Sequence, residues 1–139
     1  MIRPLLRILP ALLLLVVGCS DSSVSPADEL AGVWVLVAVN DDPLPYLDRV
    51  EQNCTHYTEG ITMTLRPDGT GSFLDTNGVV CGDGVSQTYT SSEDFRWSAE
   101  ETLISFQYDD GVRVSFPITL TGDRLTVVTV GETMTFERE

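Results

Sequence analysis

The stretch "ITMTLRPDGTGSF", residues 61–73, contains the pattern that decides the fold. Ile61, Met63 and Leu65 alternate with polar residues, which is typical of a strand with one buried face. Proline, aspartate and glycine follow at residues 67–69, where a fixed backbone angle and a permissive one favour a tight turn. Phe73 then lies on a returning strand. The stretch therefore predicts an antiparallel β-hairpin.

The same two-residue period recurs on both sides of the hairpin. The other predicted strands cover residues 30–39, 85–99, 103–108, 112–120, 125–130 and 134–138. Residues 40–59 contain prolines that cannot donate to a ladder, so we expect a long loop there, with a helical turn at 46–51. Residues 76–84 are predicted to be a glycine-rich connection. About eight strands joined mostly by short turns favour an antiparallel up-and-down barrel, because closure removes exposed sheet edges.

The apolar positions of these strands predict the barrel interior. An eight-stranded barrel has room for side chains or for one small ligand. Seven of the inward candidates are aromatic, which favours an interior that is largely filled. The candidates are Trp34, Leu36, Ile61, Met63, Leu65, Phe73, Phe95, Trp97, Ile104, Phe106, Val114, Phe116, Ile118, Leu125, Val127, Met134 and Phe136.

Residues 1–18 have the composition of a secretory leader. Arg3 and Arg7 precede an apolar run that is shorter than the roughly 20 residues needed to span a bilayer. The end of this run, Val16-Val17-Gly18-Cys19, resembles the lipobox of bacterial lipoproteins. The resemblance implies cleavage after Gly18 and a membrane anchor made of lipid on Cys19. An ordinary leader with a chance cysteine, or an uncleaved anchor, are the alternatives.

The chain therefore divides into a predicted leader, a tether and one domain. Residues 19–28 are small and polar, which indicates a flexible tether behind the lipidated Cys19, and residues 29–139 form the barrel domain. We expect an exported protein of the cell envelope, in the outer membrane if the source is Gram-negative.

The charge of the mature part excludes nucleic acid as a partner. Without the leader, six arginines oppose 21 acidic residues and there is no lysine, for a formal net charge of −15. Nucleic acid and anionic headgroups bind clustered cations, so such a field repels both.

Cys54 and Cys81 remain as a pair if Cys19 carries lipid. An exported protein is in a disulfide-permissive compartment, and a bridge between them would contribute ~3.5 kcal/mol by the loop-entropy relation. Free thiols, or a metal or redox role, are the alternatives, although no Cys-x-x-Cys spacing is present.

The opener "LAGVWVLVAVNDDPLP", residues 30–45, resembles the first strand of lipocalins and of shorter bacterial lipocalin-like domains, through Gly32-x-Trp34. The similarity extends through "TLRPDGTGSF", "FRWS", "LTGDRLTVV" and "MTFERE". It implies that Trp34 closes the barrel floor beneath an arginine near the chain end, and Arg138 is the matching candidate. A cation–π contact of this kind is worth ~0.5–2 kcal/mol. META-type envelope domains share a similar opener, but their usual Gly-Cys-Asn segment is absent.

Candidate ligand-lining residues are amphipathic aromatics. Tyr46, Tyr57 and Tyr89 are in or near loops that could ring the barrel mouth, and Trp97 is the fourth candidate. Ordinary partial burial is the alternative for the tyrosines.

No catalytic residue, metal site or cofactor is predicted. His56 is the only histidine and lies near Cys54, but a Cys–His nucleophile also needs contact and an orienting group, so a plain loop histidine is favoured. The acidic residues do not reproduce an EF-hand spacing.

Two functions remain open, and an enzyme is the less favoured third. The first is a carrier or sensor that binds a small apolar ligand in the barrel mouth. The second is a non-catalytic envelope interaction module with a filled barrel, which would use the valine face of residues 30–39 toward an unspecified protein partner. An interior void of a few hundred Å³ would favour the carrier.

Overall fold

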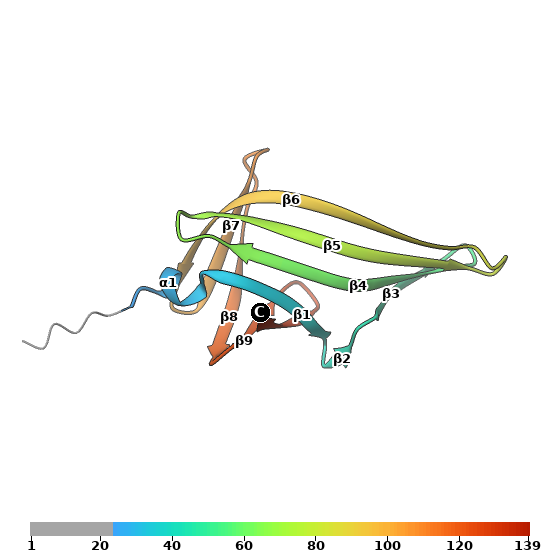
Figure 1. Ribbon diagram of the computed structural model, residues 1–139, viewed down its shortest axis with the longest axis horizontal. Coiled ribbons are helices and arrows are strands. Elements are labelled where there is room, and N and C mark those ends of the chain that lie inside the picture. Colours follow the sequence, from blue (N-terminus) through green and yellow to red (C-terminus); the bar gives the residue numbers. More distant parts are fainter. Residues whose placement is uncertain (1–23) are drawn as a thin grey trace, which may run out of the picture.

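The computed structural model describes residues 24–139, which form one short helix and ten strands of a single antiparallel sheet (Figure 1). The elements are α1 Pro26–Leu30, β1 Gly32–Val39, β2 Asp42–Pro43, β3 Tyr46–Glu51, β4 Cys54–Leu65, β5 Thr70–Cys81, β6 Ser86–Glu100, β7 Leu103–Tyr108, β8 Arg113–Thr121, β9 Arg124–Val128 and β10 Thr133–Arg138.

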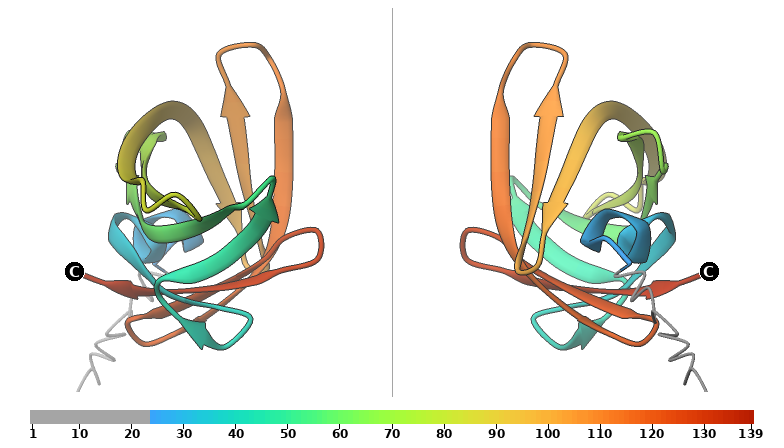
Figure 2. Two further views of the ribbon diagram at one scale, coloured as in Figure 1. Left: turned by 90° about the vertical axis from the view of Figure 1, so that its right-hand side faces the viewer. Right: turned by 90° about the vertical axis from the view of Figure 1, so that its left-hand side faces the viewer.

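Strand β1 closes the sheet into a barrel because it pairs with β10 on one edge and with β4 on the other. Trp34 accordingly lies opposite both Arg138 and Met63. The closed ring consists of β1 and β4 to β10, in meander order, and Figure 2 shows these strands wrapping round a common interior. The prediction of an eight-stranded antiparallel up-and-down barrel is confirmed, and β2 and β3 are additional strands at its rim.

The core contains every residue that was predicted to face inward, either buried or packed against the buried cluster. One detail of the first strand differs from the prediction. A β-bulge between Leu36 and Ala38 shifts the register, so Val39 is buried although the strict alternation placed it outside. The exposed valine face expected on this strand is also smaller, because Val33, Val35 and Val37 are half-buried.

Four strand segments extend beyond the closed barrel and form what we call the arm (Figure 1). Residues 86–94 of β6 pair with β5, whereas β7 pairs only with residues 95–100. The arm consists of residues 46–51, 54–60, 75–81 and 86–94.

The secondary structure of the arm differs from three sequence predictions. The long loop at 40–59 contains β2, β3 and the start of β4, and β3 occupies the place of the expected helical turn at 46–51. Residues 76–81 belong to β5, so only the end of the predicted glycine-rich connection is a turn. These segments lack apolar alternation because both faces of the arm are largely outside the core, and backbone pairing rather than burial defines them.

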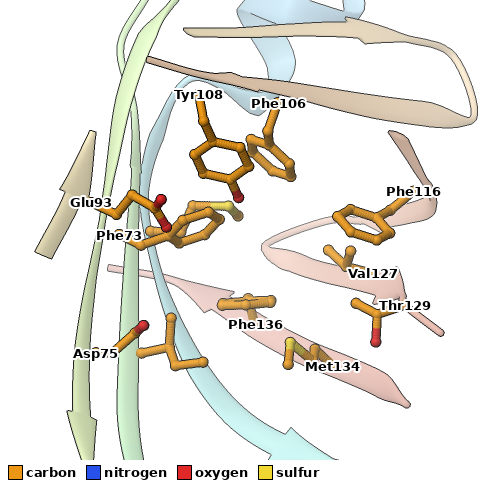
Figure 3. Close-up of a pocket in the computed structure, with 12 residues that line it drawn as sticks. Phe73, Asp75, Glu93, Phe106, Tyr108, Phe116, Val127, Thr129, Met134 and Phe136 are labelled. Carbon is orange, nitrogen blue, oxygen red and sulfur yellow. The ribbon is translucent and has the colours of Figure 1, made fainter. Parts of the chain in front are cut away.

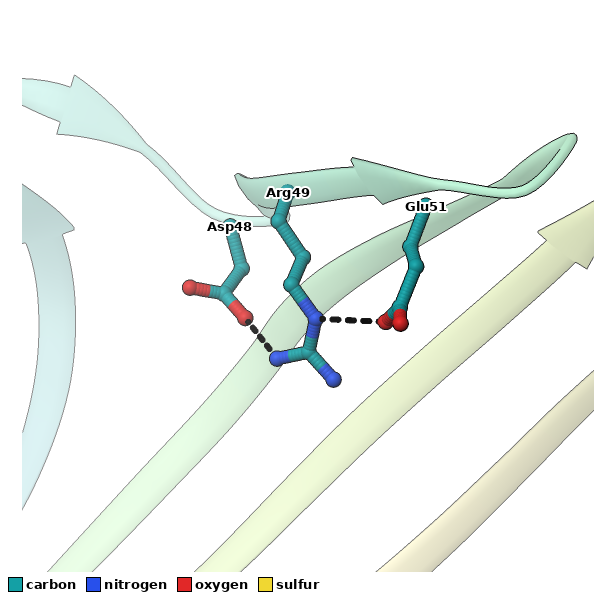
Figure 4. A network of polar contacts seen from close by, with 3 residues as sticks. All are labelled: Asp48, Arg49 and Glu51. Carbon is teal, nitrogen blue, oxygen red and sulfur yellow. Dashed lines mark hydrogen bonds and ion pairs between the residues drawn. The ribbon is translucent and has the colours of Figure 1, made fainter.

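A disulfide closes the far end of the arm. Cys54 and Cys81 are directly opposite in the β4–β5 ladder and are bonded to each other, as predicted. On the outer strand β3, Arg49 forms ion pairs with Asp48 at 3.1 Å and Glu51 at 3.4 Å (Figure 4). All three side chains are exposed, so the pairs add little stability. Charges on an edge strand do, however, hinder pairing with other chains.

Helix α1 begins inside the segment that was predicted to be a flexible tether. The Ser25 side chain accepts a hydrogen bond from the Asp28 backbone N–H and caps the helix, while Ala27 packs against the core. The predicted leader and lipid site, residues 1–18 and Cys19, lie outside the described residues. From residue 24 onward, no helix combines the length and the apolar character needed to cross a lipid bilayer.

Candidate ligand-binding cavity

A cavity of about 230 Å³ lies within the barrel, where the arm joins it (Figure 3). Its walls are mainly apolar and aromatic. The lining residues are Ile61, Met63, Phe73, Asp75, Glu93, Phe106, Tyr108, Phe116, Val127, Thr129, Met134 and Phe136. The interior is therefore not filled throughout, although its aromatic content favoured one that is largely filled.

Strand alternation explains how polar groups come to line an apolar cavity. Phe73 and Asp75 are two residues apart on β5, so both side chains project from the same face. Glu93 lies directly opposite Phe73 on β6, and Phe95, two residues on, is a core residue. The inward face of each strand thus changes from apolar to acidic where the barrel passes into the arm.

The two carboxylates and the Tyr108 phenol lie along one side of the cavity, with Phe73 between Glu93 and Asp75, as Figure 3 shows. Burial raises the pKa of Asp75. The pKa of Tyr108 is raised by burial and further by the negative charges of Glu93 and Asp75. Neither carboxylate takes part in any ion pair within residues 24–139.

The size of the cavity limits what it can hold. Pockets for drug-sized ligands measure about 300–1,000 Å³, whereas a dry cavity of about 150 Å³ accepts benzene. A volume of 230 Å³ lies between these limits. It suits a molecule with a single ring or a short alkyl chain.

None of the four residues predicted to line the ligand site lines this cavity. Trp97 is only 7% exposed, and its indole N–H donates to the Arg66 carbonyl at 2.9 Å. Tyr46 packs against the core and accepts a hydrogen bond from the Asn40 amide at 3.4 Å. These two aromatics serve the barrel itself.

The other two tyrosines belong to the arm. Tyr57 is opposite Gly78, an odd number of residues from Asp75, and therefore projects from the face away from the cavity. Tyr89 is opposite Asn77, on the cavity side, but it lies farther along the arm and is 49% exposed. Both were predicted to be in or near loops at a barrel mouth, whereas the structure places them on strands β4 and β6.

Sequence reasoning found the apolar part of the site and missed its polar part. Eight of the twelve lining residues were predicted to face inward. The missed residues are Asp75, Glu93, Tyr108 and Thr129. The available signal was the two-residue spacing of Asp75 from Phe73 and of Glu93 from Phe95.

At the opposite end of the barrel, Trp34 and Arg138 form a closed floor. Trp34 is fully buried, and its indole N–H donates to the Leu30 carbonyl at 2.8 Å. The Arg138 guanidinium lies 4.2 Å from the centre of the Trp34 ring and donates to the carbonyls of Ala31 at 2.8 Å and Glu29 at 2.6 Å. Arg138 therefore ties α1 to the barrel.

Gly32 makes room for this arginine. Its φ of +147° lies in a region that side chains rarely adopt, and a Cβ there would come within 2.7 Å of Arg138 Nη1. The three predicted floor residues thus lie together.

His56 and the cysteines do not form a catalytic pair. Cys54 is bonded to Cys81, so it has no free thiol. His56 lies in β4, opposite Arg49 and Val79, rather than in a loop. Across residues 24–139, no cluster of three or more histidine, cysteine or acidic side chains has the arrangement needed to hold a metal ion.

Comparison with known proteins agrees with the observed fold. The family model described as a lipocalin-like domain matches residues 30–127. The crystal structure of a lipocalin-like protein from Bacteroides uniformis ATCC 8492 superposes with a TM-score of 0.50 at 16% sequence identity, covering 80% of this chain and 99% of that one. A search of curated proteins finds no match. The match to the family model extends over most of the barrel, and the chain belongs to the lipocalin-like domain family.

Proposed function

We propose that this protein binds a small, largely apolar ligand in the barrel cavity and performs no chemistry on it. The observation that carries the proposal is the space of about 230 Å³ left between the aromatic walls, in a barrel whose floor end is filled. Apolar walls that face an open space unfilled by side chains forgo dispersion contacts. A ligand of matching size restores them.

The alternative, an envelope interaction module with a filled barrel, has less support. It requires a filled interior, and it would use the outer valines of β1 for contact. Val35 is half-buried, between Glu137 on β10 and Thr62 on β4. Little apolar area remains on this face for a partner.

Anchoring to a membrane through lipid on Cys19 is part of the same proposal. The supporting observation is the Val16-Val17-Gly18-Cys19 sequence behind a basic, apolar leader. An exported protein of the cell envelope, in the outer membrane of a Gram-negative source, would follow. Mass spectrometry of the mature chain should give a lipid-modified amino-terminal Cys19, and Cys19→Ser should shift the protein from the membrane fraction to the soluble one. An unmodified mature chain beginning elsewhere would refute the anchor.

Ligand binding can be tested with a neutral probe that fits the cavity. Titration of delipidated protein with 2-phenylethanol, followed by calorimetry and by NMR shifts of the cavity methyl groups, should give saturable binding. Met134→Trp, which fills the cavity from β10, should abolish it. Val128→Trp, on the exposed face of the neighbouring strand β9, is the matched control and should leave binding unchanged. If Met134→Trp binds the probe as well as the unmodified protein does, the cavity is not the site.

A further inference from the structure

The polar side of the cavity indicates which class of ligand fits. Building on the proposed function, we infer that the cavity selects a small protonated amine with an apolar body. The aromatic walls hold the body, and the ammonium group lies between Asp75 and Glu93.

The charges of the side chains that line the cavity favour a cationic ligand. Asp75 and Glu93 are acidic, and no lining residue in the described part of the chain is basic. Neither carboxylate has an ion-pair partner there. Asp75 is half-buried and Glu93 is exposed, so the cavity wall carries one partly desolvated carboxylate and a solvated one beside it, without a protein counter-charge, and this arrangement is complementary to a cation.

The positions of the two acidic residues on the sheet also favour a cationic ligand. Glu93 is opposite Phe73, and Asp75 is two residues farther along β5, so the two acids are diagonal neighbours on one face of the sheet. Side chains in this relation have backbone positions about 7–8 Å apart. This spacing leaves room between the two side chains for an ammonium group that donates to both carboxylates at once.

The aromatic residues supply the rest of the recognition. The rings of Phe73 and Phe106 are 5.3 Å apart, those of Phe106 and Phe116 are 6.2 Å apart, and the Tyr108 phenol points into the space (Figure 3). Their faces favour an apolar ring and also attract a nearby cation. A single ring with a two-carbon amine has about the size that 230 Å³ allows.

Anionic ligands are disfavoured by the same groups. The carboxylate of a fatty or aromatic acid would meet two negative charges at the polar side and would have no cation to pair with. The net charge of −15 for the mature chain, to which six arginines and 21 acids contribute, repels anions at longer range as well.

The test compares three probes of one shape. 2-Phenylethylamine, 2-phenylethanol and phenylacetate share the ring and differ in the charge of the polar end. At pH 7 and low salt, the amine should bind at least about tenfold more tightly than the alcohol, as expected for a charge-assisted hydrogen bond, and phenylacetate should bind most weakly. The preference for the amine should shrink as salt is added.

Isosteric variants locate the selectivity. Glu93→Gln and Asp75→Asn should each weaken binding of the amine by about tenfold and change binding of the alcohol by less than about threefold. Asp94→Asn is the matched control, because Asp94 is exposed and projects from the other face of β6 while losing the same charge. Its binding of all three probes should equal that of the unmodified protein.

The outcomes separate this inference from the proposed function. Equal affinity for the amine and the alcohol, with both displaced by Met134→Trp, would overturn the charge selectivity and leave the cavity as a ligand site. An amine preference that survives both Glu93→Gln and Asp75→Asn would also overturn the inference. Binding of none of the three probes would overturn both proposals.

Discussion

The guanidinium of Arg138, on the last strand of the barrel, lies 4.2 Å from the centre of the Trp34 ring on the neighbouring first strand. The same group donates hydrogen bonds to two carbonyls at the end of α1. The helix, the first strand and the last strand are thus joined by a single side chain.

Removing this side chain should destabilise the whole barrel. Arg138→Ala loses the cation–π contact and leaves two carbonyls without their donor, which together should lower the free energy of unfolding by about 2–3 kcal/mol. Urea denaturation followed by tryptophan fluorescence measures the change. Arg124→Ala, which breaks an exposed ion pair with Glu137 on the same strand pair, should cost less than about 1 kcal/mol. Equal losses in the two variants would contradict a special role for Arg138.

Gly32 should be intolerant of even one methyl group. Gly32→Ala combines an unfavourable φ with a Cβ close to Arg138 Nη1, and we expect a loss of about 2 kcal/mol in stability. In the Arg138→Ala background the close contact is gone and only the backbone strain remains. The cost of Gly32→Ala should therefore be smaller there, and thermal denaturation of the four proteins of this cycle measures the coupling. Full additivity would show that the two residues act independently.

Loss of the disulfide should loosen the arm more than the barrel. The chain-entropy relation gives the Cys54–Cys81 bridge ~3.5 kcal/mol if the protein unfolds as a unit. The bridge lies at the far end of the arm, however, so the Cys54→Ser, Cys81→Ser double variant should first lose amide protection in residues 54–60 and 75–81. Hydrogen exchange should leave the protection of β8 to β10 nearly unchanged. A uniform loss of protection in arm and barrel alike would contradict this division.

The cavity carboxylate Asp75 should cost stability at neutral pH. Burial raises its folded-state pKa above the ordinary 3.8, so the native state binds the proton more tightly than the unfolded chain does. Stability therefore falls as the pH rises from the unfolded pKa through the folded one. Asp75→Asn should be more stable than the unmodified protein at pH 7, by less than about 1 kcal/mol because the group is partly solvated, and equally stable near pH 3.

Asp68 provides a control of opposite sign for this pH dependence. Its carboxylate accepts hydrogen bonds from the Thr70 hydroxyl at 2.7 Å and the Thr70 backbone N–H at 2.9 Å, which lower its pKa. The stability it contributes is present above its unfolded pKa and is lost as the pH falls through the folded one. Asp68→Asn should therefore be less stable at pH 7. Melting curves of both variants between pH 3 and pH 7 that move in the same direction would contradict this assignment.

The sequence is sufficient to predict the barrel because burial imposes a period of two on each of its strands. The alternation of Ile61, Met63 and Leu65 predicts one such strand. The tight turn at Gly69, with φ of +83°, then makes the next segment, β5, its antiparallel partner. The arm is different. Its strands are not pressed against a core, so residues such as Thr88 and Thr90 carry no information about which face is inside, and their pairing depends on backbone groups and the disulfide.

The cavity could not be predicted from the sequence pattern either. Phe73 and Phe106 were predicted to point inward, but inward direction alone does not reveal whether neighbouring rings meet or leave a space. That depends on how β6 and β7 diverge on the arm side of Phe95, where their pairing stops, which is a property of the whole sheet. Asp75 and Glu93 were overlooked because an acid on an inward face contradicts the burial pattern on which the prediction relied.

The arm rises from only one side of the barrel rim, and this asymmetry has a consequence for chemical tolerance. Asp75 and Glu93 stand at its base, while Asn77 and Tyr89 continue the same face outward. For the amine ligand that we propose, the volume of 230 Å³ consequently limits the size of the ring and not that of the substituents on the nitrogen. N-alkylated amines with long substituents, lying along the inner wall of the arm, should be accommodated as readily as the primary amine.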